Sequence, residues 1–362
     1  MNQLHIFLSN LEHNYKVLRS HINNDTELIA VLKANGYGSE IVNISHKLES
    51  LGVNQIAVAY VDEGVYLRKQ GVKIPILIFY PQEENFDKII KYNLEPSLYS
   101  VQTLNKFKKI INLQKKIKYP VHIKYNTGLN RIGFKPEKVK WVLKEIQNDS
   151  MLIKSVYSHL ASSESSKKNP LSIKQINLFL KIKEYHQTNF VSKTKFHLLN
   201  SSGVFNYPEY QFDAVRCGIA LHGYANKLKW DKKLKPIAEL TTTICQIHRI
   251  KKGTAVGYDN GWIASKDSSI ATLPIGHADG IGRHFGNQRG YVLIKGKLVP
   301  IIGNICMDML MIDITDIKCR EGDIVSIFGK HNNASGFAEM GDTISYELLS
   351  SLGKRVKRVI HI

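Results

Sequence analysis

Short apolar segments alternate with longer amphipathic segments over the first two-thirds of the chain. Eight of the apolar segments end near Lys33, Tyr60, Tyr80, Tyr99, Asn126, His159, Ser201 and Arg216. Continuous apolar runs are typical of strands buried on both faces, and helical connections between successive strands require a parallel sheet. Eight such units within about 220 residues favour an α/β fold, a closed (β/α)8 barrel of the TIM type, over an open Rossmann sheet.

The pattern changes after about residue 235, where segments rich in Val, Ile and Thr are separated by turn residues. Lys295-Gly296-Lys297 lies between apolar flanks and predicts a β-hairpin. We therefore expect two domains. Residues 8–234 would form the barrel, and residues 235–362, together with residues 1–7, would form a mostly-β C-terminal domain.

Composition excludes several classes of protein. The chain has 362 residues, of which 43% are hydrophobic and 22% charged, as is typical of globular proteins. The sequence has no run of 18 apolar residues and no signal-peptide pattern at its N-terminus, so we expect no membrane association. The four cysteines include no C-x-x-C pair, so we expect no metal site and a reducing compartment, the cytoplasm.

The net charge of +19 is unusual and permits binding to nucleic acid. The first 232 residues hold 33 basic and 19 acidic side chains. Basic runs at 115–118 and 227–235 lack the interleaved aromatic residues of a single-strand binding platform. A solvated lysine-rich surface is therefore favoured, no nucleic-acid partner is expected, and a nucleic-acid binder remains an alternative that rests on charge alone.

Candidate catalytic side chains lie at the ends of the predicted barrel strands, where barrel enzymes carry their active sites. They are Lys33, Lys124, Arg131, His159, Ser201 and Arg216. Each alone has an ordinary structural explanation, such as a solvated lysine or a core histidine. Their common position at one rim, however, indicates a site.

The turns after the seventh and eighth predicted strands are suited to binding a phosphate group. They read Asn200-Ser201-Ser202-Gly203 and Cys217-Gly218-Ile219, and they offer a hydroxyl and backbone N–H groups. Together with Lys33 on the first strand, they suggest pyridoxal 5′-phosphate (PLP) bound as a Schiff base. An enzyme acting on a phosphosugar is the alternative that these residues leave open.

Motifs along the chain resemble those of the alanine racemase family. In the barrel portion they are VLKANGYG around Lys33, HIKYNTGLNRIGF at 122–134, SHLASS at 158–163, HLLNSSG at 197–203 and FDAVRCGIAL at 212–221. In the second portion they are VGYDNGW at 256–262, LPIGHADG at 273–280, IIGNICMD at 301–308 and TISYE at 343–347. The resemblance implies a PLP-dependent isomerase that interconverts L- and D-alanine for peptidoglycan synthesis.

The resemblance also implies roles for individual residues. Lys33 would bind the cofactor and act as one base, and Tyr258 of a partner subunit would act as the second base, linked to His159 behind it. Arg216 would face the pyridine nitrogen, and Arg131 would contact the cofactor and the substrate carboxylate. The remaining cofactor contacts would come from Tyr37, Asn200, Ser201, Gly218, Ile219 and Tyr346. The substrate would be bordered by His277 and by the partner's Met307 and the partner's Asp308.

The implied chemistry explains these residue types. Inverting an α-carbon requires removal of a proton from one face and its return to the other, so two opposed bases are expected. An arginine stays protonated and disfavours protonation of the pyridine nitrogen, which should favour simple reprotonation over transamination. A second base supplied by the partner implies a homodimer with shared active sites.

The chain departs from the family pattern at a few positions. Ser39-Glu40 replaces the usual His-Gly, Asn126 replaces an aspartate, and His222 replaces an aromatic residue. Lys124 matches a lysine that is carbamylated in the family. His277 stands where a tyrosine is expected, so a broader racemase acting on serine or a basic amino acid is an alternative, as is a non-catalytic PLP-binding protein.

Overall fold

The computed structural model describes residues 2–146, 150–164, 169–190, 193–225 and 227–362. The chain divides into two compact units. The larger unit comprises Glu12–Gly36 and Ile41–Leu234, and the smaller unit comprises Met1–Leu11, Tyr37–Glu40 and Lys235–Ile362. None of the described helices is both long and apolar enough to cross a membrane.

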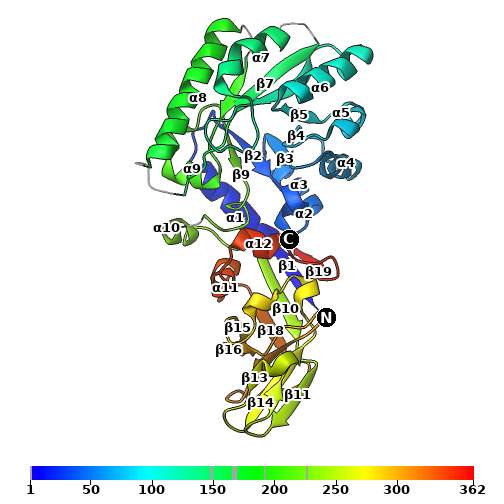
Figure 1. Cartoon of the computed structure of the whole chain (residues 1–362), viewed down its shortest axis with the longest axis vertical. Helices are drawn as coiled ribbons and strands as arrows, with labels where there is room; N and C mark the ends of the chain where they lie inside the picture. The colour runs from blue at the N-terminus through cyan, green and yellow to red at the C-terminus, as the bar shows by residue number, and fades with distance from the viewer. Residues whose placement is uncertain (1, 147–149, 165–168, 191–192, 226) are drawn as a thin grey trace. The chain divides into compact units, whose positions relative to one another are not determined.

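Eight parallel strands close into a barrel in the larger unit, which confirms the predicted fold (Figure 1). The first and last strands pair with each other through a register that sets Ile29 opposite Arg216. The strands are β2 (Glu27–Val31), β3 (Gln55–Val58), β4 (Ile76–Ile78), β5 (Glu95–Leu98), β6 (Tyr119–Lys124), β7 (Met151–Tyr157), β8 (Lys195–His197) and β9 (Ala214–Cys217). Each ends within a few residues of its predicted end.

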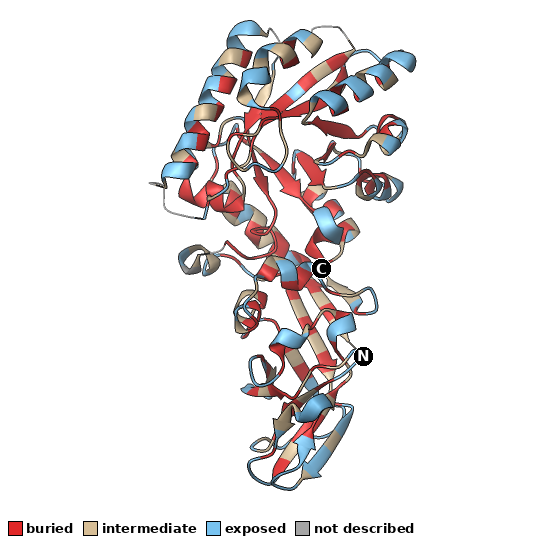
Figure 2. Ribbon diagram, in the orientation of Figure 1, coloured by how far each residue is buried: buried red, intermediate tan, exposed pale blue. Residues whose placement is uncertain are grey.

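Helices follow the strands and present apolar faces to them, so that buried residues run along the barrel strands and the outer helix faces are exposed (Figure 2). Local signals fix several helix starts. The Ser100 side chain, for example, caps α6, and Asn169 followed by Pro170 begins α8. The helices are α1 (Leu8–Arg19), α2 (Lys33–Tyr37), α3 (Ile41–Ser50), α4 (Val61–Lys69), α5 (Phe86–Lys91), α6 (Val101–Leu113), α7 (Val139–Ile146), α8 (Pro170–Asn189), α9 (Ser201–Asn206) and α10 (Leu228–Asp231).

The smaller unit is built on a nine-stranded sheet in the order β11-β14-β17-β16-β15-β18-β10-β1-β19. The predicted hairpin at Lys295-Gly296 is confirmed, because both residues have positive φ and join two antiparallel strands. The elements are β1 (Gln3–Phe7), β10 (Ala238–Thr243), β11 (Gln246–Ile250), β12 (Ala255–Val256), β13 (Trp262–Ile263), β14 (Ser268–Leu273), β15 (Tyr291–Ile294), β16 (Lys297–Ile302), β17 (Leu310–Asp313), β18 (Ile324–Phe328), β19 (Lys357–His361), α11 (Ala334–Met340) and α12 (Ser345–Ser350).

Two short segments that the sequence prediction places in the barrel domain group with the smaller unit, namely residues 8–11 and 37–40. The physical reason at 37–40 is close backbone packing. Gly38 has φ +74, and a Cβ atom there would lie 1.9 Å from the carbonyl oxygen of Leu349. The carbonyl oxygen of Gly38 also accepts hydrogen bonds from the Arg358 guanidinium at 2.8 and 3.2 Å.

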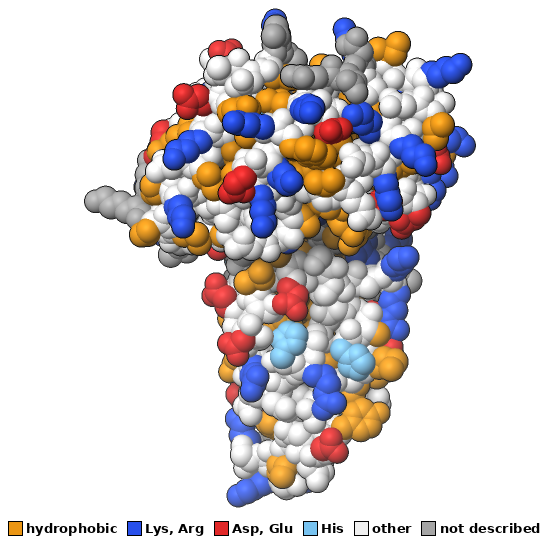
Figure 3. Space-filling model, turned by 45° about the horizontal axis from the view of Figure 1, so that its top comes forward, with side chains coloured by type: hydrophobic (Ala, Val, Ile, Leu, Met, Phe, Trp, Pro, Cys, Tyr) orange, Lys and Arg blue, Asp and Glu red, His pale blue; other side chains and the backbone are white. Residues whose placement is uncertain are grey.

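The positive charge is dispersed on the face that Figure 3 shows. Lysine and arginine side chains there are separated by acidic, apolar and uncharged residues. Several surface lysines are also paired with carboxylates, such as Lys108 with Glu145 at 3.0 Å and Lys88 with Asp62 at 2.9 Å. This arrangement is typical of a solvated surface.

Candidate active site

The predicted catalytic side chains of the barrel lie at one rim, after or within the carboxyl ends of their strands. Lys33 follows β2, Lys124 ends β6, His159 follows β7, Ser201 begins the helix after β8, and Arg216 lies in β9. The positive charges among them are close enough to depress one another's pKa values. The structure therefore brings together residues that the sequence spaces over more than half of the barrel.

Lys33 opens a strained turn of the backbone. Ala34, Asn35 and Gly36 have φ between 53° and 62°, and Tyr37 follows with φ 53°. Left-handed backbone costs about 1–2 kcal/mol for each residue that is not glycine, and such strain tends to persist at functional sites. The Glu63 carboxylate holds the turn, accepting from the N–H of Ala34 at 2.6 Å through one oxygen.

Glu63 was not expected from the sequence to contribute to the site. Its other oxygen accepts from the N–H groups of Ala59 at 2.8 Å and Tyr60 at 3.0 Å, which closes the start of α4. The carboxylate therefore ties the turn after the first barrel strand to the end of the second. A glutamate three residues after the N-cap residue, here Tyr60, is a capping signal that could have indicated it.

The environment of Lys33 favours the free amine. The side chain reaches solvent, but desolvation by the surrounding barrel lowers its pKa, and the positive charge of Arg131 lowers it further against the opposing charge of Glu63. A lysine with a lowered pKa has a larger neutral fraction near neutral pH, and only the neutral amine is a nucleophile or a base. Lys33 is therefore suited to both predicted roles.

Arg131 lies in a loop that folds back on the end of β6. The N–H of Asn126 donates to the carbonyl of Phe134 at 2.9 Å, and a Cβ at Gly133 would lie 2.6 Å from the Asn126 nitrogen. The Asn126 side-chain oxygen accepts from the N–H groups of Gly128 and Asn130. Asn126 thus shapes the loop that carries the exposed Arg131, a role that either asparagine or aspartate can fill.

Lys124 is almost fully buried, with 5% of its surface exposed. Burial lowers its pKa to about 7, and the charges of Arg216, Arg131 and Lys33 act in the same direction. Its amine lies 5.6 Å from the centre of the Tyr157 ring, and no carboxylate of the described residues forms an ion pair with it. A substantial fraction of the amine is consequently neutral at neutral pH.

We expect the free energy of unfolding of the cofactor-free chain to rise with pH through a contribution that Lys124→Met removes. The folded-state pKa is about 7, and the unfolded value is about 10.4, so between them the unfolded chain binds more protons. The free-energy cost of burying the charged Lys124 amine is fully present below its pKa in the folded chain. This cost is relieved as the pH rises toward its pKa in the unfolded chain. The contribution of Lys124 to the slope of the free energy of unfolding against pH is at most about 1.4 kcal/mol per pH unit.

Urea unfolding in CO2-free buffer, measured between about pH 7 and 9.5, checks this expectation. Lys181→Met is the matched control, because Lys181 is exposed on α8 and should keep the wild-type slope. Equal slopes for the wild type and Lys124→Met would show that the Lys124 amine titrates normally.

Arg216 is buried and its guanidinium donates several hydrogen bonds. Its Nη2 donates to the carbonyls of Ser158 at 2.6 Å and Leu198 at 3.0 Å, and its Nη1 donates to His197 Nδ1 at 2.7 Å. Burial lowers its pKa to about 10, which leaves the guanidinium charged at neutral pH. Among the described residues no acceptor is found for its Nε–H, so one donor of a rigidly held cation remains available at the rim.

His159 lies beside this guanidinium, with Nδ1 3.3 Å from Arg216 Nη2. Burial lowers its pKa well below the usual value, and the positive charge of Arg216 adds to the effect. The ring is therefore neutral and accepts at Nδ1, which leaves the proton on Nε2. A neutral histidine that donates from Nε2 could hydrogen-bond a tyrosine oxygen, as its predicted link to Tyr258 requires.

The turns predicted to bind phosphate lie next to each other. Ser201 Oγ accepts from the N–H groups of Gly218 at 3.1 Å and Ala220 at 3.3 Å. Ser201 and Ile219 are buried. Asn200 is committed to capping α9, since its side-chain oxygen accepts from the N–H of Gly203 at 2.9 Å.

The smaller unit holds the other predicted site residues. The rings of Tyr37 and Tyr346 lie 5.9 Å apart between centroids. Tyr258 and Met307 are exposed, at 68% and 60% of their surfaces. His277 is also exposed.

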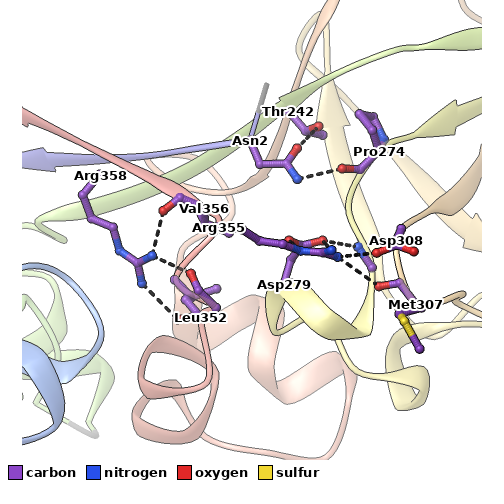
Figure 4. A network of polar contacts seen from close by, with 12 residues as sticks. Asn2, Thr242, Pro274, Asp279, Met307, Asp308, Leu352, Arg355, Val356 and Arg358 are labelled. Carbon is purple, nitrogen blue, oxygen red and sulfur yellow. Dashed lines mark hydrogen bonds and ion pairs between the residues drawn. The ribbon is translucent and has the colours of Figure 1, made fainter.

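Asp308 belongs to an ion-pair network that the sequence did not predict (Figure 4). Arg355 contacts Asp308 at 2.6 Å and the buried Asp279 at 2.7 Å. It also donates to the carbonyl of Met307 at 3.4 Å. The network fixes the segment that carries Met307 and Asp308, and no local sequence signal links Arg355 to it.

Two departures from the family pattern are buried in the structure. His222 is 1% exposed, and burial lowers its pKa to about 3, so the ring is neutral. Ser39 is fully buried in the segment that groups with the smaller unit. Both therefore act through packing rather than as exposed polar groups.

Comparison with known proteins identifies the family. The model of the alanine racemase N-terminal domain matches residues 6–226, and that of the alanine racemase C-terminal domain matches residues 237–360. The alanine racemase of Treponema denticola is 37% identical, over 98% of this chain and 96% of its own length.

Solved structures agree. The alanine racemase of Clostridium difficile 630 superposes with a TM-score of 0.93 at 31% identity, covering 99% of this chain and 95% of that one. The alanine racemase of Bartonella henselae, described with covalently bound pyridoxal phosphate, gives 0.90 at 29% identity, covering 99% of each chain. Because the similarity extends in order through both portions of the chain, this protein belongs to the alanine racemase family, a family of isomerases.

Proposed function

We propose that this enzyme interconverts L-alanine and D-alanine with PLP as its cofactor, and that it supplies D-alanine for peptidoglycan in the cytoplasm. The observation that carries the proposal is the set of cationic groups around the Lys33 amine, whose pKa is lowered by desolvation and by Arg131. Such a set suits a cofactor that bears a phosphate and a substrate that bears a carboxylate. The bound pyridoxal phosphate of the Bartonella henselae relative supports the same cofactor.

The residues present fit PLP. Lys33 supplies an amine of lowered pKa for the covalent bond, and the Nε–H of Arg216 is a donor suited to the pyridine nitrogen. We assign the phosphate to Ser201, Gly218 and Ile219, and the family resemblance adds Tyr37 and Tyr346 as proposed contacts. Asn200 would contribute through the helix start that it caps. When bound, PLP withdraws electrons from the substrate α-carbon and so acidifies its C–H bond.

Two protein bases then exchange the α-proton. The Lys33 amine removes or returns the proton on one face of the α-carbon. The phenolic oxygen of Tyr258 of the partner subunit does so on the opposite face. His159, neutral and protonated on Nε2, hydrogen-bonds the partner's tyrosine and holds it in place. Arg216 remains charged, which disfavours a proton on the pyridine nitrogen and so favours reprotonation at the α-carbon.

The substrate is held by its carboxylate and limited in size by its neighbours. Arg131 offers a planar guanidinium that can bind a carboxylate through two parallel hydrogen bonds. We assign the border of the substrate to His277, to the partner's Met307 and to the partner's Asp308. The Arg355 network that fixes the Met307–Asp308 segment in each chain would keep that border rigid.

A homodimer with shared active sites follows from these assignments. Tyr258 and Met307 are both largely exposed within one chain. Large side chains left exposed together are typical of a surface that is covered in the assembly. A two-fold dimer is the simplest closed arrangement that delivers each tyrosine to the other chain's lysine.

We also propose that Lys124 is carbamylated. Its pKa of about 7 leaves a neutral amine that can attack CO2, forming an N–C bond and releasing one proton. The resulting carbamate is an anion, and the surrounding Arg131 and Arg216 would stabilise it. The two compact units are proposed as the two domains of the chain.

Chiral analysis of amino acids after incubation with enzyme and PLP tests the function. We expect L-alanine and D-alanine each to be converted to an equal mixture. Because His277 is polar where a tyrosine is expected, serine and a basic amino acid belong on the same panel. Faster racemisation of either would replace alanine as the proposed substrate, and racemisation of none would refute the activity.

A further inference from the structure

A row of buried polar side chains runs through the barrel interior from Arg216 toward the opposite end of the strands. Arg216 Nη1 lies 2.7 Å from His197 Nδ1, and His197 Nε2 lies 2.7 Å from Ser155 Oγ. Ser155 Oγ lies 2.6 Å from His122 Nδ1, and His122 Nε2 lies 2.8 Å from Glu95 Oε2. The five residues come from five consecutive barrel strands, β9 to β5, and all are less than 9% exposed.

When each histidine carries one proton, the two ends of this relay set the direction of every hydrogen bond in it. A guanidinium can only donate, so His197 accepts at Nδ1 and carries its proton on Nε2. Burial lowers the pKa of His197 well below its usual value, so the ring holds a single proton. His197 therefore donates to Ser155.

The hydroxyl of Ser155 then has one acceptor left among the described residues, His122 Nδ1. His122 in turn carries its proton on Nε2 and donates to Glu95. Burial alone would raise the pKa of Glu95, but the hydrogen bond from His122 and nearby positive charges outweigh it and lower the pKa. Gln55 Nε2 also donates to this carboxylate at 2.6 Å, so the far end of the relay is an anion that accepts only.

A cavity of about 200 Å³ lies beside the relay and is lined by Glu95, His122, Ser155 and His197 but not by Arg216. Besides the relay residues it is lined by Glu27, Gln55, Lys154 and Lys195, which lie at the amino-terminal ends of their strands or close to them. This is the opposite rim from the one that holds Lys33. Glu95 therefore borders the cavity, whereas Arg216 does not, although both residues are buried.

We propose that Glu95, His122, Ser155 and His197 are positioning residues that hold the Arg216 guanidinium in one orientation through a one-directional relay anchored at the far end of the barrel. With Nη1 fixed on His197 and Nη2 on two carbonyls, the plane of the guanidinium is set and its Nε–H points in one direction. No proton moves along the relay in this role. The inference deepens the proposed function, because it rests on Arg216 facing the cofactor.

The test begins with the full chain without PLP, labelled with 15N in its histidines. We expect His197 and His122 both to be protonated on Nε2 and unprotonated on Nδ1. Ser155→Ala removes the acceptor of the His197 Nε2–H, so the Nε2 resonance of His197 should shift while Arg216 keeps Nδ1 unprotonated. His122 loses the donor at its Nδ1 and should begin to exchange between tautomers. Ser155→Thr keeps the hydroxyl and should restore the wild-type resonances.

Three further variants extend the measurement. Ser45→Ala is the matched control, because Ser45 is a buried serine on α3 with no hydrogen bond to the relay, so the His197 and His122 resonances should not change. Glu95→Gln keeps an accepting oxygen and should leave His122 protonated on Nε2. Glu95→Leu removes it and should release His122. The Glu95 variants and the wild type keep the inference testable if Ser155→Ala does not fold.

The PLP-loaded enzyme supplies the second readout. Ser155→Ala loosens His197, which holds Arg216, so it should weaken PLP binding by up to roughly tenfold, and Ser155→Thr should restore it. A proton on His197 Nδ1 in the wild type, or unchanged His197 resonances in Ser155→Ala, would overturn the relay. If the histidines have the expected tautomers but the chain neither binds PLP nor racemises alanine, the proposed function is refuted and the relay is not.

Discussion

Alanine racemisation should fall by at least ~10⁴-fold in Lys33→Ala, because the change removes both the covalent anchor for the cofactor and one of the two bases. The visible absorbance of bound cofactor should disappear in the same variant. Lys33 reaches solvent at the barrel rim, and its amine makes no ion pair with the described carboxylates, so the fold should be retained. Chiral analysis and absorbance spectroscopy of the same preparation check both effects.

Lys181→Ala provides the control for this experiment, since Lys181 is an exposed lysine on the outer helix α8. It should keep wild-type activity and absorbance. Racemisation that persists in Lys33→Ala at more than a small fraction of the wild-type rate would exclude Lys33 as the cofactor lysine. A normal absorbance with no activity would assign it to the base role alone.

Tyr258→Phe should lower racemisation by roughly 10² to 10⁴-fold, the usual range for removal of one positioned acid–base group. The phenol is 68% exposed in the chain, so losing its hydroxyl should not change stability. Exchange of the α-proton with solvent deuterium should persist for the enantiomer that Lys33 deprotonates and be lost for the other. Mass spectrometry of each alanine enantiomer in D2O measures this difference.

Mixing variants tests whether the tyrosine acts across a dimer. Lys33→Ala and Tyr258→Phe chains, unfolded and refolded together, should regain about a quarter of wild-type activity, because a random mixture leaves one intact site in half of the dimers. Tyr291→Phe changes another exposed tyrosine of the same unit and should leave the racemisation rate unchanged. Unchanged rates of racemisation from L- and from D-alanine in Tyr258→Phe would exclude Tyr258 as the second base. If the refolded mixture recovers no activity, the active sites are not shared between subunits.

The local sequence was informative wherever structure depends on neighbouring residues. Buried parallel strands need continuous apolar runs, so the ends of all eight barrel strands could be placed to within a few residues. The hairpin at Lys295-Gly296 needs positive φ at both positions, which a glycine signals. The rim residues could be listed because strand direction alone puts Lys33, Lys124 and Arg216 at the same end of a parallel barrel.

Local sequence could not predict the left-handed turn after Lys33. Two of its residues, Ala34 and Tyr37, adopt left-handed backbone angles that their types do not favour, and the Glu63 carboxylate of α4 bonds the N–H of Ala34 from a distant part of the sequence. The same holds for residues 37–40, which lie within the barrel sequence but group with the smaller unit through Arg358. Both features depend on partners that are distant in the sequence.

By itself, then, the sequence determined the barrel, the β-rich portion and the types of side chain at the carboxyl-terminal rim of the barrel, because these follow from periodicity and strand direction. Only the tertiary structure decided the protonation states. The pKa of Lys124 falls to about 7 through burial among cations, and Arg216 is oriented by the relay to Glu95, whose members come one from each of five strands. Electrostatic energy depends on distance and burial, which a linear pattern of residues does not contain.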